Sequence, residues 1–126
     1  MTNMNISQVL VTFIVFITLD AIYLTSMKTY FDNQVKSIQG SIIQMNLLAA
    51  ILCYISLVFG IYYFIIREKK SLFDAFLLGL VIYTVYEFTS WALFKNWKIS
   101  TVIMDSLWGA TLFTLTTAIV YFIYGK

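Results

Sequence analysis

Four long apolar segments separated by short polar breaks account for most of this chain. Each has more than twenty residues, which at about 1.5 Å of helical rise per residue is enough to cross a hydrocarbon core of roughly 30 Å. The strands of a membrane barrel would instead alternate apolar and polar residues over about ten positions, and these segments do not alternate. The pattern therefore predicts four membrane-spanning helices, at residues 6–27, 44–66, 72–94 and 101–124.

The positions of the basic residues support this division of the chain. All eight fall in the breaks or at the C-terminus: Lys28, Lys36, Arg67, Lys69, Lys70, Lys95, Lys98 and Lys126. The expected fold class is therefore all-α, a polytopic four-transmembrane-helix bundle that forms a single membrane domain over residues 1–126. With four crossings, both termini share a side with the dense basic cluster from Arg67 to Lys70. Four basic residues lie on each side of the membrane, so only the density of this cluster favours cytoplasmic termini under the positive-inside rule.

Two shorter stretches each have a second interpretation. The N-terminal stretch MTNMNISQ has no basic residue, and no small-residue cleavage site follows the first apolar run, so we expect a retained span rather than a signal peptide. Between the first two spans, Phe31, Val35 and Ile38 recur at helical spacing. That spacing predicts a short amphipathic helix at the membrane interface over residues 30–40. An ordinary loop with apolar anchors is the alternative.

The composition excludes several classes of function. The chain is 61% hydrophobic and 11% charged, whereas a soluble domain carries about 25% charged residues, so its expected surroundings are a lipid bilayer. A net charge of +2 provides no basic face for nucleic acid. With one cysteine and no histidine, neither a disulfide nor an ordinary zinc site can form within one chain, and no cofactor is expected.

Three acidic residues lie inside the predicted spans. Asp20 and Glu87 each come eight residues before a lysine of the following break, and Asp105 comes seven residues after one. Eight residues of helix measure about 12 Å, and these breaks lie on one side of the membrane, so the three carboxylates are expected at one depth. Asn46 enters the same layer at the start of the second span. The remaining acids are interpreted as loop or helix-capping residues: Asp32, Glu68 and Asp74.

An acid inside a span has to avoid lipid. Insertion of an ionised acid at a helix centre costs about 2.5–3.5 kcal/mol, so the three acids are expected to face inward, toward one another, toward water or toward Asn46, and to titrate as a coupled set. Aromatic donors occur three or four positions away on the same helices, and we assign them to the same ligand- or proton-binding site: Tyr23, Tyr83, Trp91 and Trp108. The alternative is a hydrogen-bonded network that only holds the helices together.

Small residues at helical spacing indicate helix-packing faces, because they let two backbones approach closely in lipid. The predicted faces are Ala49, Cys53, Ser56 and Gly60 in the second span, Ala75 and Gly79 in the third, and Ser106, Gly109 and Ala110 in the fourth. Cys53 is therefore interpreted as a packing residue rather than as a nucleophile.

Three stretches resemble a known family: LDAIYL (19–24), GLVIYTVYEFTSWALFKNW (79–97) and MDSLWGA (104–110). They are similar to domain-of-unknown-function family twenty-one seventy-seven, whose members are small, mainly bacterial four-span proteins. Members typically have an aspartate followed by Trp-Leu in the first span, then Y-x-x-Y-D-L-T-N, and D-x-x-W-G in the last span. This chain departs from that pattern at Tyr23, Glu87, Phe88 and Ser90. The resemblance implies a four-helix membrane protein and supplies no particular activity.

Three functions are consistent with these features. The first is binding and transport of a proton or a small cation by the carboxylate and aromatic layer; four helices are too few to enclose a path, so a homo-oligomer is expected. The second is a non-catalytic structural or partner-binding membrane subunit. The third is an enzyme acting on a membrane lipid, which is less expected because histidine and a metal-rich motif are missing.

Overall fold

The computed structural model describes residues 4–126, which are helical apart from short connections. The elements are α1 (Ile6–Ser26), α2 (Lys28–Gln39), α3 (Leu47–Ile61) continued by the π-helical turn η1 (Tyr62–Ile66), α4 (Leu72–Leu93) and α5 (Ile99–Tyr124). Four rods, α1, α3 with η1, α4 and α5, are long and apolar enough to cross a membrane. The all-α fold class predicted from the sequence is therefore confirmed.

Polar side chains fix where three of these rods begin. Asn5 precedes α1 and accepts a hydrogen bond from the backbone N–H of Gln8 at 3.1 Å. Ser71 precedes α4 and accepts one from the backbone N–H of Asp74 at 3.0 Å. Asn46 does the same for α3. Because the first N–H groups of a helix have no partner inside it, such caps set the start of the helix. Each rod begins and ends within three residues of the span predicted for it.

The connection between the first two rods is a helix rather than an ordinary loop. Helix α2 begins directly after Met27 and ends at Gly40, whose φ of +82° is in the left-handed region that glycine adopts readily. Asp32 therefore lies in a helix, which corrects its assignment to a loop. The location of α2 at the bilayer interface stays a prediction.

A single buried glutamine holds α2 against the break between α4 and α5. Gln34 is 2% exposed, and its amide nitrogen donates to the backbone carbonyl of Asn96 at 3.0 Å. Its side-chain oxygen accepts from the backbone N–H of Lys98 at 3.1 Å and from the hydroxyl of Thr101 at 2.6 Å. These hydrogen bonds of one side chain hold α2 against the α4–α5 break, so α2 covers this end of the bundle.

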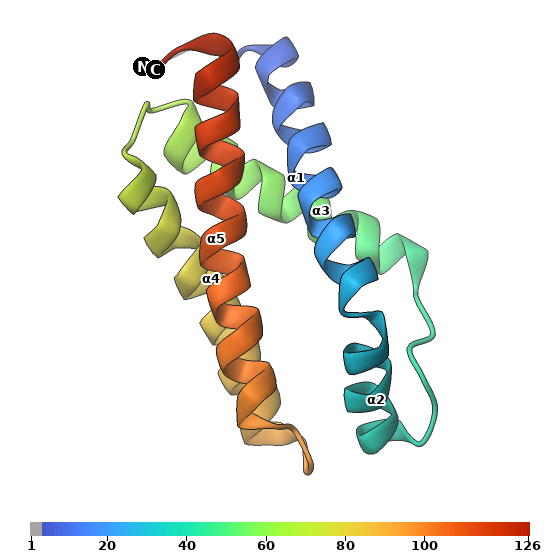
Figure 1. Cartoon of the computed structure of the whole chain (residues 1–126). Helices are drawn as coiled ribbons and strands as arrows, with labels where there is room; N and C mark the ends of the chain where they lie inside the picture. The colour runs from blue at the N-terminus through green and yellow to red at the C-terminus, as the bar shows by residue number, and fades with distance from the viewer. Residues whose placement is uncertain (1–3) are drawn as a thin grey trace.

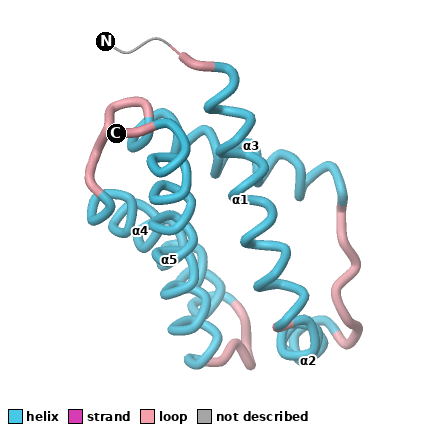
Figure 2. Tube along the Cα trace, turned by 45° about the horizontal axis from the view of Figure 1, so that its top comes forward, coloured by secondary structure: helices cyan, strands magenta, loops and turns pink. Residues whose placement is uncertain are grey.

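The rods do not form a regular four-helix square. In Figure 1, α4 and α5 lie side by side, α1 lies on the other side of α5, and α3 crosses α1 obliquely. Both termini are at one end, and α2 and the α4–α5 break are at the other (Figures 1 and 2). Helix α5 is the central element, and its inner face includes the fully buried Leu112, Phe113 and Val120. The ring of Phe113 meets the edge of Phe16 from α1 at 5.6 Å between centroids.

Glycines bring α4 and α5 into close contact. A Cβ at Gly79 would overlap the backbone oxygen of Gly109 and the side chain of Phe113, and a Cβ at Gly109 would overlap the ring of Tyr83. Ala75 on α4 and Ala110 on α5 are fully buried as well. The packing faces predicted for the third and fourth spans are therefore confirmed.

The packing face predicted for the second span is wrong within one chain. Cys53 is exposed, and no atom lies within 4 Å of a Cβ built at Gly60. The residues of α3 that pack inward are Tyr54, Leu57, Val58 and Ile61. Because one residue of helix turns the chain by about 100°, the small-residue stripe lies beside the inward stripe and not on it.

Candidate functional site

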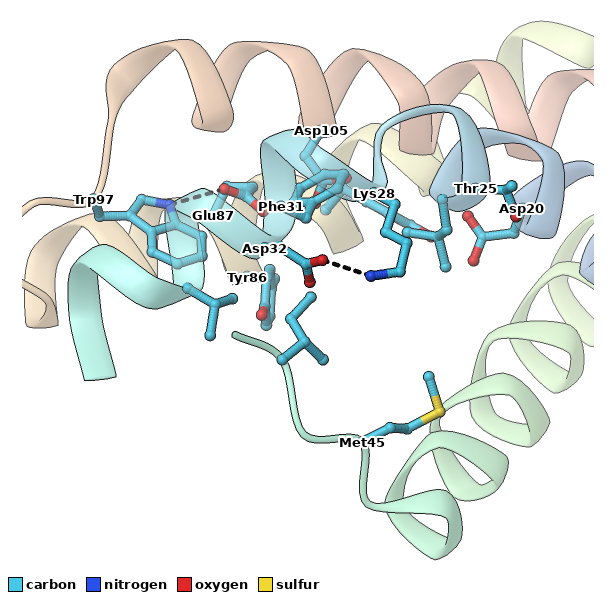
Figure 3. A pocket seen from close by; sticks show the side chains of 14 residues that line it. Asp20, Thr25, Lys28, Phe31, Asp32, Met45, Tyr86, Glu87, Trp97 and Asp105 are labelled. Atoms are coloured by element: carbon cyan, nitrogen blue, oxygen red, sulfur yellow. Dashed lines mark hydrogen bonds and ion pairs between the residues drawn. The ribbon is translucent and has the colours of Figure 1, made fainter. Parts of the chain in front are cut away.

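All three intramembrane acids line one cavity of about 540 Å³ near the end of the bundle that carries α2 (Figure 3). Asp20 comes from α1, Glu87 from α4 and Asp105 from α5. Helix α2, the later part of the α2–α3 connection and Trp97 of the α4–α5 break complete the wall. The lining residues are Asp20, Leu24, Thr25, Lys28, Phe31, Asp32, Val35, Ile43, Met45, Tyr83, Tyr86, Glu87, Trp97 and Asp105. The chain therefore gathers its intramembrane carboxylates around a single space.

Asp20 is the most completely bonded of the three. Its carboxylate is 6% exposed and accepts from the hydroxyl of Tyr54 on α3 at 2.5 Å and from the indole N–H of Trp108 on α5 at 2.9 Å. Each oxygen has its own donor. One carboxylate on α1 therefore connects three rods of the bundle, and both of its oxygens are satisfied in a medium that offers no water.

Glu87 on α4 and Asp105 on α5 come from the two closely packed rods and line the same cavity, so we treat them as a pair. Glu87 is 1% exposed and accepts from the indole N–H of Trp97 at 3.0 Å. Asp105 accepts from the hydroxyl of Tyr23 at 3.4 Å, which is a long and therefore weak bond. In the view of Figure 3, Asp105 lies between Glu87 and Asp20. The pair thus has less donor support than Asp20.

Charge at the cavity is not purely negative. Lys28 and Asp32, one turn apart on α2, form an ion pair of 2.6 Å and both line the cavity. Lys28 is largely exposed, whereas Asp32 is largely covered. Of the four acids that line the cavity, Asp32 has its own cation, and Asp20, Glu87 and Asp105 form no ion pair within residues 4–126.

The donors do not come from the helices predicted to supply them. Aromatic residues three or four positions along the same helix were expected to satisfy each acid, but Asp20 is bonded by α3 and α5, and Asp105 by α1. Glu87 is bonded by Trp97, ten residues further along, in the α4–α5 break. The reason is the length of the side chains. Helix axes pack about 8–10 Å apart, and a short carboxylate on one helix together with a long Tyr or Trp side chain on the next spans that distance. A ring on the same helix as the acid extends beyond the carboxylate, so its polar atom does not meet it.

The aromatic and amide residues assigned from the sequence have different locations. Tyr83 lines the cavity, and Tyr23 and Trp108 stack on each other with centroids 4.5 Å apart while each donates to an acid. Trp91 does not line the cavity; it is 45% exposed and stacks on Phe88.

Asn46 does not line the cavity either. Its side chain accepts from the backbone N–H of Ala49 at 3.1 Å and caps α3. A capping oxygen that is already bonded to its own helix cannot reach across to the acids at the same time, which explains why the amide and the carboxylates do not meet.

The sequence reasoning did not assign the donors Tyr54 and Trp97 to the site, nor the lining residues Tyr86 and Lys28. Tyr54 had a usable signal, because it is a hydroxyl-bearing aromatic residue near the middle of the second span. Trp97 and Lys28 lie outside the spans, so only the fold brings them to the acids.

Chemically, the site offers hydrogen-bond acceptors and aromatic faces. Ionised carboxylates only accept, and they attract protons, metal cations and organic ammonium groups. The aromatic residues Phe31, Tyr86 and Trp97 also line the cavity, and the face of an aromatic ring attracts a cation. Within residues 4–126, no cluster of three or more His, Cys, Asp and Glu residues has a geometry that would hold a metal ion.

The fold and this buried polar layer define the class of the protein: it is a polytopic integral membrane protein with four spanning helices. The chain belongs to the DUF2177 family, described as predicted membrane proteins, whose sequence profile matches residues 5–122. The resemblance noted in the sequence is thereby confirmed. No curated protein and no solved structure matches the chain.

Proposed function

We propose that this protein binds a proton or a small cation at Asp20, Glu87 and Asp105 and transfers it across the membrane. One observation carries the proposal: these three carboxylates, from three different rods, line a single cavity. Asp20 and Glu87 are almost completely buried. Holding acids at this depth is costly, and a bound cation or proton offsets that cost.

The Glu87–Asp105 pair is the part of the site where binding is most favourable. Two ionised carboxylates in one cavity repel each other strongly in a medium of low dielectric constant. A proton shared by the pair, or a cation between them, removes this repulsion, whereas Asp20 already has two donors. We therefore assign binding to the pair and assign to Asp20 the positioning of α1, α3 and α5 around it.

We propose that the working unit is a homo-oligomer with its termini in the cytoplasm. A single chain provides a cavity near one end of the bundle, and only three of its rods carry acids to it. Four helices rarely enclose a complete path, so a second copy would have to supply the remainder. The basic cluster of Arg67, Lys69 and Lys70 lies at the same end as both termini, which is the cytoplasmic end under the positive-inside rule.

The test is flux into liposomes that contain only the purified protein. We expect a proton or monovalent-cation flux that depends on pH and that falls at least tenfold in the double variant Glu87→Gln, Asp105→Asn, since the neutral amides neither take up a proton nor attract a cation. The matched control is Asp74→Asn, which makes the same chemical change at an exposed position on α4 outside the cavity. Full flux in the double variant, or no flux from the wild type, would overturn the proposal.

A structural role is the second candidate, and a separate observation favours it. The carboxylate of Asp20 connects α1, α3 and α5, and the Tyr23–Asp105 bond connects α1 and α5 again. Such a network holds helices together without any ligand. Suppose that the wild type shows no flux. A loss of stability in the Glu87→Gln, Asp105→Asn variant then favours the structural role. Unchanged stability in that variant excludes both the transport role and the structural role.

A further inference from the structure

A second groove lies between α1 and α3, toward the end of the bundle that carries the termini and away from the acidic cavity. It has a volume of about 390 Å³. Its lining is Met4, Val9, Phe13, Ile55, Val58, Phe59, Tyr62, Tyr63 and Arg67. All of these except Arg67 are apolar or aromatic, so the groove is lined by apolar groups and has one basic residue at its end.

Arg67 is buried to an unusual degree for a basic residue. It is 9% exposed, and its guanidinium lies over the ring of Tyr63 at 3.9 Å. One terminal nitrogen donates to Glu68 at 2.8 Å. The Nε–H is inaccessible to solvent and has no hydrogen-bond partner among residues 4–126. Leaving a charged donor unpaired in this way costs about 1–3 kcal/mol or more, which calls for an acceptor beside it.

The backbone before Arg67 accounts for this placement. Residues Tyr62–Ile66 form a π-helical turn, with the N–H of Arg67 bonded to the carbonyl of Tyr62 at 2.8 Å. The hydroxyl of Tyr62 in turn accepts from the backbone N–H of Asn5 at 2.9 Å, which brings the start of α1 to the same place. Arg67 is therefore fixed at the junction of α1 and α3 rather than extended into water, as its neighbours Lys69 and Lys70 are.

The groove faces lipid along its length. Ile55 is 49% and Phe59 57% exposed, and exposed positions on a membrane-spanning helix contact acyl chains. In a bilayer, the acyl chain of a lipid can therefore occupy the groove. At the end where Arg67 lies, a phospholipid carries its phosphate, a tetrahedral anion, and a planar guanidinium can bind two of its oxygens with two parallel hydrogen bonds.

We propose that Arg67 and this groove form a binding site for one anionic phospholipid. The phosphate accepts from the terminal nitrogens of the Arg67 guanidinium, and one acyl chain lies along Val9, Ile55 and Phe59. Lys69 and Lys70 add positive charge beside the site, and basic residues near a membrane surface favour anionic lipids by about 1 kcal/mol each. The site is separate from the acidic cavity, so it does not depend on the transport proposal.

The experiment is lipid binding to the detergent-solubilised protein, followed by native mass spectrometry and by thermal unfolding. Three probes are compared: phosphatidylglycerol, phosphatidylcholine and inorganic phosphate. We expect one tightly retained phosphatidylglycerol, at least tenfold weaker retention of the zwitterionic lipid, and no stabilisation by inorganic phosphate, because the site needs both a net anionic head group and a tail.

Two variants locate the site. Arg67→Gln removes the cation, and we expect it to weaken phosphatidylglycerol binding about tenfold. The control Lys70→Gln removes the same charge from an exposed position of the same loop outside the groove, and we expect at most a twofold loss. Ile55→Trp adds bulk at an exposed position of the groove and leaves Arg67 in place, and we expect it to displace the acyl chain and to weaken binding as strongly.

Three outcomes would overturn the proposal. They are equal retention of the two lipids by the wild type, stabilisation by inorganic phosphate equal to that by phosphatidylglycerol, and equal effects of Arg67→Gln and Lys70→Gln. If Arg67→Gln does not fold, the comparison of probes on the wild type and on Ile55→Trp still decides the matter, since neither requires that variant.

Discussion

At the scale of single residues, each intramembrane carboxylate is matched to an aromatic donor from another part of the chain. Tyr54 and Trp108 bond Asp20, Tyr23 bonds Asp105, and Trp97 bonds Glu87. Phenol and indole groups suit this role because they carry one N–H or O–H donor on a large apolar body. The acids are thus retained inside the bundle without basic partners on the rods.

The bond between Tyr54 and Asp20 provides a stability test. Tyr54→Phe removes only the hydroxyl, which leaves one oxygen of a buried carboxylate without its donor. We expect a loss of about 1 kcal/mol in the free energy of unfolding, within the range measured for hydrogen bonds between membrane helices. Thermal or steric-trap unfolding in bicelles measures it.

Tyr63→Phe is the matched control, because it makes the same change to a tyrosine of the same rod that lines the other groove. Within residues 4–126 its hydroxyl takes part in no side-chain hydrogen bond with the acids. An equal loss of stability in both variants would show that the Tyr54–Asp20 bond contributes nothing of its own.

At the scale of elements, close packing of α4 on α5 sets the geometry of the acidic pair. Gly79 and Gly109 let the two backbones approach until no side chain fits between them. Glu87, two helical turns beyond Gly79, and Asp105, one turn before Gly109, are then brought to the same cavity from the two packed helices. The glycines therefore position the proposed binding site as well as the helices.

Substitution of single glycines by alanine separates two effects on stability, the overlap of an added methyl group with a neighbouring helix and the higher helix propensity of alanine. Gly79→Ala places a methyl group against the backbone of α5, and we expect a destabilisation of about 1–3 kcal/mol, as for other overpacked sites. Gly60→Ala adds the same methyl group where the surroundings are open, and we expect no loss or a gain of up to about 1 kcal/mol from the better helix former.

Both variants are compared by thermal unfolding in the same detergent. A Gly60→Ala protein that is as destabilised as Gly79→Ala would mean that the α3 stripe is covered in the protein as it exists in solution, and would point to contact between copies through that face.

At the scale of the whole molecule, an even number of crossings puts both termini and the Arg67–Ser71 turn at one end and places α2 with the α4–α5 break at the other. The acidic cavity lies near the second end and the Arg67 groove near the first. The two candidate sites therefore open toward opposite leaflets.

Thiol labelling in intact cells or oriented vesicles tests this topology. The background is Cys53→Ser, which removes an exposed cysteine of α3 that forms no disulfide in the described chain. In this background, the single substitutions Lys70→Cys and Lys126→Cys are expected to be labelled from the cytoplasm. A cysteine at Asn96 is expected to label from the outside. Labelling of Lys70→Cys and Asn96→Cys from the same side would contradict a four-span arrangement.

The sequence by itself determined the four spans, the end of the molecule at which each break lies, and the layer that holds Asp20, Glu87 and Asp105. These follow from hydropathy, charge and helical rise, which are local properties that act along the chain. Close packing of the third and fourth spans was also readable, because small residues mark it.

Only the tertiary structure decided which groups meet. The oblique crossing of α3 turned Cys53 and Gly60 outward and brought Tyr54 to Asp20, and the break after α4 returned Trp97 to Glu87. Asn46 was drawn to its own backbone and Trp91 to the outer surface. These contacts depend on the angle and rotation of one helix against another, which are set by packing over the whole bundle and leave no local mark in the sequence.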